Sequence, residues 1–267
     1  MRNNVENIVI IGAGNVATHL AKAFLSINKN ILQVISKTEK SAKELASKIN
    51  CPYSTNLEDL KAGADLYLLA VSDPAIEKIA REFPFKNVLI AHTSGSVSME
   101  ILKTASTNYG VFYPLQTFTK NISLDYNKIP FCLEANTNDS LNILKHLGSE
   151  ISDQTYEINF KQRQTLHLAA VFACNFTNHM YSIANEILKK DDLSFKILQP
   201  LIEETAKKIK TLFPDEAQTG PAVRNDEQTI AKHVEKLNMF EDYQKIYTFM
   251  TESIRKKIKT RIGLKNK

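Results

Sequence analysis

Residues 7–25, NIVIIGAGNVATHLAKAFL, decide the fold class of this chain. A short apolar run ends in glycines, and a helical pattern begins at Asn15. Gly12, Gly14 and Ala17 fit the pattern G-x-G-x-x-A, in which the first glycine permits a tight turn, the second lets the backbone approach a pyrophosphate, and the alanine lets helix and strand pack closely. The pattern predicts a dinucleotide site at the helix N-terminus, formed by Gly12, Ala13, Gly14, Asn15 and Val16. A glycine turn without a ligand is the weaker alternative.

The first half of the chain alternates apolar runs with helical patterns. NIVIIGAG, ILQVISK, DLYLLAVSD and NVLIAHTSG are separated by helical segments, and YGVFYP and IPFCLEA follow as further strands. This alternation is typical of a mostly parallel sheet with helices on both faces. After about Glu157 only helical patterns remain. We therefore expect an α/β Rossmann-like dinucleotide-binding domain over residues 1–157, and an all-α substrate and dimerisation domain over residues 158–267.

Composition narrows the class of protein. The chain has 267 residues, 43% hydrophobic and 24% charged, as expected of a soluble globular protein. A net charge of +5 is too mild to indicate a nucleic-acid partner, and no apolar run is long enough for a signal peptide or a membrane span. The three cysteines lack metal or redox spacing. We expect a cytoplasmic protein that needs no metal, nucleic acid or membrane, with His19 and His146 at the surface.

The end of the second predicted strand indicates which dinucleotide binds. An acidic residue there would bind the ribose 2′-hydroxyl of NAD. This chain instead has Ser36, Lys37 and Thr38, two hydroxyls and a cation that suit a 2′-phosphate. The segment favours NADP over NAD. That Lys37 is an ordinary surface lysine is the alternative.

Polar residues follow the later strands. Ligands of open α/β sheets lie beyond the carboxyl ends of the strands, so these positions are candidates for contacts. We expect Val71, Ser72 and Ser94 to contact the cofactor, and His92 and Gln116 to contact the substrate. An equal alternative is that Ser94 or Ser96 caps the short helix that begins near Met99.

Residues 159–190 are predicted to form one long helix that is apolar at its centre, and therefore buried by its own domain or by a partner subunit. At about 100° per residue, His167, Asn175 and Asn178 share one side of this helix. His167 is then the candidate catalytic acid, with Asn175 or Asn178 holding a carbonyl or an imine. A buried histidine with satisfied hydrogen bonds, and asparagines that join helices, are the equal alternative.

The stretch TGPAVRND, residues 219–226, separates two predicted helices. Gly220 and the proline after it suit a turn, and Asn225 or Asp226 suits an N-cap of the next helix. Arg224 beside a helix N-terminus suits an anion, so Thr219, Gly220 and Arg224 are candidate contacts for a substrate carboxylate. We give equal weight to a purely structural role of this loop and to a role in binding the substrate carboxylate.

Five segments carry a family resemblance over nearly the whole chain: GAGNVA, HTSGSVSMEIL, YGVFYPLQTF, LHLAAVFACNFTNH and QTGPAVRNDEQTIAKHVEKL. The chain resembles Rossmann-like proteins with a C-terminal domain of unknown function 2520, which are distantly related to pyrroline-5-carboxylate reductase and to deazaflavin coenzyme-dependent NADP oxidoreductases. The resemblance implies an NADP-binding domain, a helical domain used in dimerisation, and oxidoreductase activity. Many relatives carry His where this chain has Tyr113, so a proton-transfer role does not carry over to that position.

These observations together predict an NADP-dependent oxidoreductase. It would transfer a hydride to or from a small carbonyl, hydroxy or imine substrate that bears a carboxylate, and it would form a homodimer through its C-terminal helices. The predicted architecture resembles that of β-hydroxyacid dehydrogenases, in which the equivalent helix supplies a catalytic lysine and an asparagine, and no lysine lies on the polar side of this helix. A non-catalytic NADP-binding sensor or assembly protein is therefore the alternative.

Overall fold

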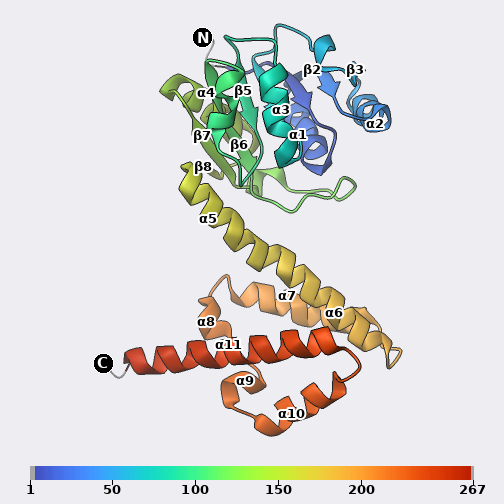
Figure 1. Cartoon of the computed structure of the whole chain (residues 1–267), viewed down its shortest axis with the longest axis vertical. Helices are drawn as coiled ribbons and strands as arrows, with labels where there is room; N and C mark the ends of the chain where they lie inside the picture. The colour runs from blue at the N-terminus through green and yellow to red at the C-terminus, as the bar shows by residue number, and fades with distance from the viewer. Residues whose placement is uncertain (1–3, 266–267) are drawn as a thin grey trace. The chain divides into compact units, whose positions relative to one another are not determined.

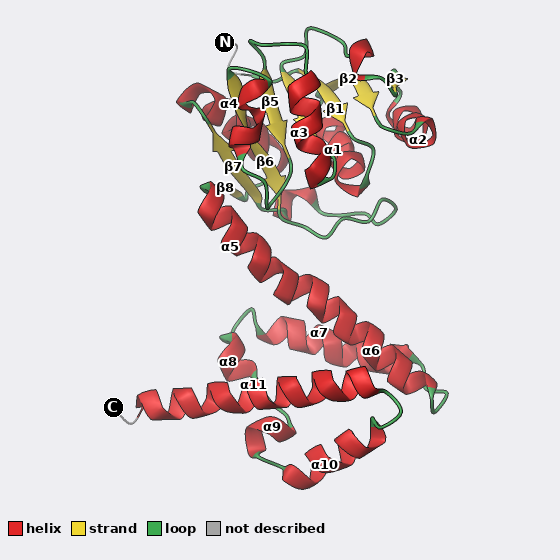
Figure 2. Ribbon diagram, in the orientation of Figure 1, coloured by secondary structure: helices red, strands yellow, loops and turns green. Residues whose placement is uncertain are grey.

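The computed structural model describes residues 4–265. The chain divides into two compact units, Met1–Asn175 and Phe176–Lys267, which we name the sheet unit and the helical unit. Strands occur only before residue 158 within the described chain, as Figure 2 shows. The first part of the predicted long helix belongs to the sheet unit. This division therefore does not test the predicted domain boundary between residues 157 and 158, which stays a prediction.

The sheet unit contains an eight-stranded sheet in the order β3-β2-β1-β4-β5-β6-β7-β8 (Figure 1). Neighbouring strands are parallel except β6 and β7, which are antiparallel. The predicted α/β Rossmann-like fold with a following helical region is thereby confirmed. The strands are β1 (Asn7–Ile11), β2 (Asn30–Ile35), β3 (Tyr53–Ser54), β4 (Leu66–Leu69), β5 (Leu89–His92), β6 (Asn108–Pro114), β7 (Phe131–Ala135) and β8 (Thr155–Glu157).

Helices cover both faces of this sheet. The helices of the sheet unit are α1 (Asn15–Ser26), α2 (Glu39–Ile49), α3 (Asp73–Glu82), α4 (Asn138–Ile151) and α5 (Phe160–Ala170), with short 3-10 turns η1 (Leu57–Asp59), η2 (Met99–Thr104) and η3 (Tyr126–Lys128). Alternate residues of β1 point to opposite faces, so Ile8 and Ile10 belong to the hydrophobic cluster that includes residues of α1 and α4, whereas Val9 and Ile11 belong to the cluster that includes residues of α3. Burial on both faces explains why these strands are continuous apolar runs.

The predicted long helix has a break in its helical period. After α5, residues Val171–Phe176 form a π-helical segment, and α6 (Thr177–Lys189) follows. A π turn is wider than an α turn because its hydrogen bonds run from i to i+5. The uniform 100° per residue that placed His167 and Asn178 on one side of the helix is therefore wrong across this segment.

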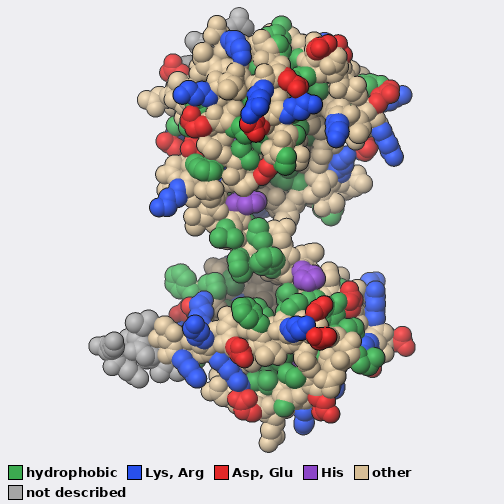
Figure 3. All heavy atoms as spheres, viewed as in Figure 1, with side chains coloured by type: hydrophobic (Ala, Val, Ile, Leu, Met, Phe, Trp, Pro, Cys, Tyr) green, Lys and Arg blue, Asp and Glu red, His purple; other side chains and the backbone are tan. Residues whose placement is uncertain are grey.

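The helical unit has a small core of its own. Its elements are α6, η5 (Phe195–Leu198), α7 (Gln199–Lys208), α8 (Pro214–Ala217), α9 (Pro221–Arg224), α10 (Glu227–Lys236) and α11 (Glu241–Lys265). Up to residue 261, its buried residues are Ile183, Ala222, Leu237 and Thr251, each 6–8% exposed. Figure 3 shows hydrophobic side chains on the exposed surface of this unit. No described helix is both long enough and apolar enough to cross a membrane.

One surface prediction is wrong. His146 is exposed as expected, but His19 on α1 is only 1% exposed. A ring nitrogen of His19 lies 2.8 Å from the backbone oxygen of Thr119, and the other lies 3.1 Å from the Tyr126 hydroxyl. The loop after β6 covers this face of α1, and a helical period cannot reveal a covering loop.

Candidate functional site

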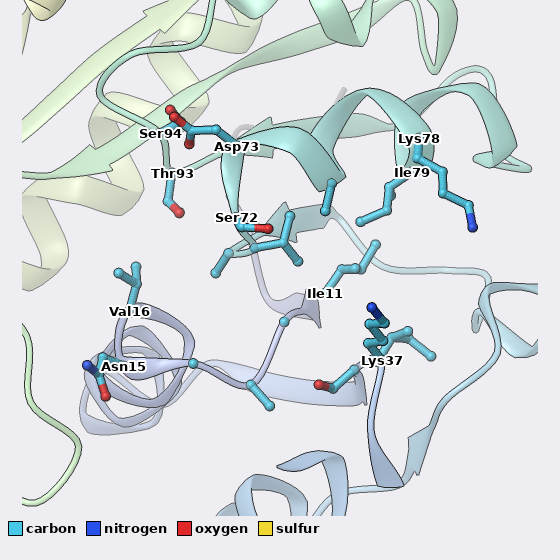
Figure 4. Close-up of a pocket in the computed structure, with 18 of the residues that line it drawn as sticks. Ile11, Asn15, Val16, Lys37, Ser72, Asp73, Lys78, Ile79, Thr93 and Ser94 are labelled. Carbon is cyan, nitrogen blue, oxygen red and sulfur yellow. The ribbon is translucent and has the colours of Figure 1, made fainter.

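A cavity of about 890 Å³ lies at the carboxyl ends of the parallel strands of the sheet unit (Figure 4). Its walls come from the segments that follow β1, β2, β3, β4 and β5, together with the end of β6 and one face of α3. His167 of α5 also lines it. The cavity therefore lies at the edge where open α/β sheets bind their ligands.

The glycine loop at the cavity wall matches its predicted chemistry. Gly12 has φ +125°, and a Cβ at this position would lie 2.0 Å from the backbone oxygen of Ala70, so only glycine fits between β1 and β4. Gly14 is the N-cap of α1, and a Cβ there would meet no atom within 4 Å. Among residues 4–265 no side chain caps α1, and Gly14, Asn15 and Val16 line the cavity. Open space beside uncapped N–H groups fits a pyrophosphate.

Of the eleven residues predicted to bind cofactor, ten line this cavity: Gly12, Ala13, Gly14, Asn15, Val16, Ser36, Lys37, Val71, Ser72 and Ser94. Thr38 does not. Its hydroxyl instead accepts a hydrogen bond from the Ser41 N–H at 3.4 Å and caps α2. Sequence reasoning also missed one face of α3, formed by Ala75, Lys78, Ile79 and Glu82. Their spacing of i, i+3, i+4 and i+7 places them on one side of a helix, which is the signal that could have found them.

Figure 4 places Ser94 and Asp73 at the end of the cavity away from Lys37 and Lys78. The Ser94 hydroxyl accepts hydrogen bonds from the N–H groups of Ser96 and Val97, both at 3.1 Å, and the Ser96 hydroxyl donates to Asp73. The residue that caps η2 is Ser98. The alternative that Ser94 or Ser96 caps this helix is therefore wrong, because both hydroxyls serve the loop before it.

Tyr113 and His167 meet at the cavity wall. The Tyr113 hydroxyl lies 3.0 Å from Nδ1 of His167. A Cβ on Gly95 would lie 2.8 Å from Cζ of Tyr113 and 2.7 Å from that Nδ1, so Gly95 leaves the space in which the two rings meet. Burial raises the pKa of Tyr113 to about 12, so the phenol keeps its proton at neutral pH. The sequence did not predict this pair, because its members come from β6 and α5.

A buried arginine fixes the helix that carries His167. Arg163 is fully buried, pairs with Glu134 of β7, and donates from Nη2 to the backbone oxygen of Val97 at 2.6 Å. The other Glu134 oxygen accepts the N–H of Phe160 at 3.0 Å. The first turn of α5 is thus tied to the sheet and to the loop after β5, and His167 lies one turn further along.

His92 is fully buried and does not line the cavity, which differs from its predicted contact with substrate. Its Nδ1 accepts the Ser94 N–H at 3.2 Å. Burial, and then the charge of Arg163, lower the pKa of His92 to about 4. A neutral ring that accepts at Nδ1 carries its proton on Nε2. His92 therefore holds the backbone of the loop at Ser94.

The other predicted site residues lie elsewhere. Gln116 is exposed, and its side-chain oxygen accepts the N–H of Thr117 at 2.8 Å; Asn175 is exposed in the π segment. Asn178, Thr219, Gly220 and Arg224 belong to the helical unit, and their roles at a substrate site stay predictions.

The predicted turn before α10 has more structure than expected. Residues Pro221–Arg224 form the short helix α9, and the exposed Arg224 ends it. Asp226 is confirmed as the N-cap of α10, because its carboxylate accepts the N–H of Thr229 at 3.1 Å, whereas Asn225 is left-handed at φ 52°. Within residues 4–265, no three His, Cys, Asp or Glu side chains are grouped as metal ligands would be.

The fold and the glycine loop define a dinucleotide-binding protein, and comparisons place it in a family. Residues 7–94 match the family model described as NADP oxidoreductase coenzyme F420-dependent, and residues 129–254 match the domain of unknown function DUF2520. A protein of Bacteroides fragilis, described as a candidate NADP oxidoreductase, is 43% identical, with a TM-score of 0.90 over 95% of this chain and 99% of that one. The chain belongs to the same family as this Bacteroides fragilis protein. This membership confirms the predicted class, an NADP-dependent oxidoreductase, and the resemblance on which that prediction rested.

Two more distant structures share the fold. Pyrroline-5-carboxylate reductase of Streptococcus pyogenes is 16% identical, with a TM-score of 0.64 over 95% of this chain and 99% of that one. An imine reductase of Myxococcus stipitatus, in complex with NADP+, is 15% identical, with a TM-score of 0.65 over 95% of this chain and 94% of that one. No curated protein matches the chain.

Proposed function

We propose that this chain is an NADP-dependent oxidoreductase that interconverts a small carbonyl or imine compound with its alcohol or amine. The observation that best supports this proposal is that the glycine loop and the Tyr113–His167 pair line the same cavity. When bound, NADP(H) supplies or accepts the hydride. The chain must then supply a proton, and this pair is suited to move it.

The proton step follows from the pKa of Tyr113. A lone phenol whose pKa is about 12 would leave a costly phenolate if it gave up its proton. When His167 is protonated, its Nδ1–H donates to the Tyr113 oxygen. The phenol proton can then pass to the substrate oxygen or nitrogen while the Nδ1 proton passes to Tyr113. The pair ends as neutral phenol and neutral imidazole, and oxidation of the substrate runs the same transfers in reverse.

Two features of the chain hold this pair in place. Gly95 leaves room for the two rings, and Arg163 ties α5 to β7. Arg163 does not line the cavity, so we assign it a positioning role.

The experiment is a screen of NADPH oxidation by the purified protein against keto acids and cyclic imines, each with and without a carboxylate. Turnover of a compound of either class supports the proposal. Tight NADPH binding without turnover of any of them would contradict it and leave the non-catalytic sensor.

We further propose that the substrate bears a carboxylate that Arg224 binds. The support is an exposed guanidinium with no side-chain hydrogen bond or ion pair within the described part of the chain. Arg224→Ala should raise the KM of the carboxylate-bearing compound and leave that of the matched neutral compound unchanged. An equal change for both compounds would remove this role.

A homodimer through the helical unit is part of the same proposal. Up to residue 261 this unit buries four residues, and it exposes large apolar side chains from α6, η5, α7 and α11 and from the segments between helices. The exposed set is Phe176, Ile187, Leu193, Ile197, Leu201, Ile209, Leu212, Phe213, Met239, Phe249 and Met250. So much apolar surface on so small a core favours a second copy as its cover.

A further inference from the structure

We propose that Lys78 of α3 is a second cation for the 2′-phosphate of NADP, opposite Lys37, and that the pair sets the preference over NAD. This inference rests on the proposed function only for the identity of the cofactor. Nothing in the glycine fingerprint or in the segment after β2 points to α3.

The two lysines approach one end of the cavity from different elements. Lys37 follows β2, Lys78 lies on α3, and both line the cavity. In Figure 4 their ammonium groups extend into the space between these elements, at the end away from Asp73 and Ser94. A group bound at this end would therefore meet a positive charge from each side.

Both ammonium groups are available to a ligand. Lys37 is exposed and makes no side-chain hydrogen bond or ion pair with the described residues. Lys78 has one ion-pair partner there, Glu82, at 4.0 Å, and their side chains are 76% and 54% exposed. An exposed pair at this distance is weak, so Lys78 can turn toward a ligand at little cost.

The charge of the ligand calls for more than one lysine. A phosphate monoester carries a charge of about −1.5 to −2 at pH 7, and one ammonium neutralises only part of it. A lysine acts on phosphate as a point charge, so two lysines from opposite walls complement it better than one.

The rest of the α3 face fits an adenosine. Ala75 and Ile79 share this face with Lys78 and present small and apolar surface to the cavity. Glu82 also lies on this face, and its carboxylate opposes a bound phosphate. Lys78 and Glu82 should therefore have opposite effects on the affinity for the 2′-phosphate.

The test is calorimetric titration of the full chain with adenosine 2′,5′-bisphosphate and with adenosine 5′-monophosphate. These probes differ in the 2′-phosphate, and their binding needs no turnover. We expect Lys78→Ala and Lys37→Ala each to weaken binding of the bisphosphate about fivefold and to leave binding of the monophosphate unchanged. Glu82→Gln should tighten the bisphosphate about twofold.

Lys103→Ala is the matched control, because Lys103 is an exposed lysine of η2 outside the cavity lining and its loss changes the net charge equally. It should change neither affinity. If Lys78→Ala leaves the bisphosphate unchanged, or weakens both probes equally, the role of Lys78 is overturned. If the unaltered protein does not prefer the bisphosphate, the proposed use of NADP itself fails, which is a different result.

Discussion

The Tyr113 hydroxyl and Nδ1 of His167 lie 3.0 Å apart although 54 residues separate them in the chain. One comes from the end of β6 and the other from α5, and both face the cavity that the glycine loop lines. This contact joins Tyr113, to which the resemblance carried over no proton-transfer role, to His167, the candidate acid.

Replacing either member of the pair should slow turnover and leave NADPH binding intact. We expect Tyr113→Phe and His167→Asn each to lower kcat about 100-fold, because both remove the proton relay. The double variant should be no slower than the worse single one, since the two residues act together. Tyr109→Phe is the control: the Tyr109 hydroxyl donates to Glu100 at 3.1 Å, away from the cavity. Additive losses, or an equal fall in melting temperature, would contradict the relay.

The two glycines of the fingerprint should respond differently to alanine. Gly14→Ala should fold normally, because φ is −80° and the new Cβ meets nothing within 4 Å, yet it should weaken NADPH about tenfold or more by occupying the space of the pyrophosphate. Gly12→Ala should instead lower the free energy of unfolding, because its Cβ would lie 2.0 Å from the Ala70 oxygen. Thermal unfolding and fluorescence titration of both variants check this. Unchanged affinity in Gly14→Ala would remove the pyrophosphate from this loop.

His92 should make stability depend on pH between about 4 and 6.5. Its folded pKa, about 4, lies below its usual 6.5, so in this window the unfolded chain binds a proton that the folded chain does not. The free energy of unfolding should therefore fall by up to about 3 kcal/mol as the pH drops from 7 to 4. Urea unfolding of the protein and of His92→Asn isolates this contribution: the advantage of the unaltered protein should shrink toward pH 4. Parallel pH curves would show that His92 does not contribute.

The proposed dimer can be tested with charges on two equally exposed apolar residues. Leu201 of the helical unit is 63% exposed, and Ile122 of the sheet unit is 58% exposed. Leu201→Glu should shift the mass in solution from dimer to monomer, because an unpaired carboxylate buried in an apolar interface is costly. Ile122→Glu should leave the dimer intact. Sedimentation equilibrium measures the mass of each variant in solution. A monomeric mass for the unaltered protein would rule the dimer out.

The sequence revealed those parts of the fold and the site whose chemistry is local. The fingerprint at Gly12 and Gly14 depends on backbone conformation at the residues themselves, and the alternating apolar runs report burial on both faces of a sheet. Contacts between segments that are far apart in the sequence have no comparable local sequence pattern. Tyr113 and His167 meet only once β6 and α5 are packed, and the ion pair of Arg163 with Glu134 joins α5 to β7.

The π segment was missed for a different reason. Each residue of VFACNF can occupy an α-helix, and the sequence carries no proline or glycine that would mark the wider turn. The face of α3 that carries Lys78 was visible in the helical period. It could be assigned to the site only after the cavity had been located.

The two glycines of the first loop differ in what forbids a side chain. At position 12 the obstacle is the neighbouring strand, which is present in every folded copy of the chain. At position 14 the described residues leave the space open, and the proposed ligand is what would exclude a side chain. In a descendant that no longer binds the dinucleotide, glycine would be retained at position 12, whereas position 14 would accept other residues. The residues at these two positions in a relative's sequence would therefore indicate, before any assay, whether that relative still binds a dinucleotide.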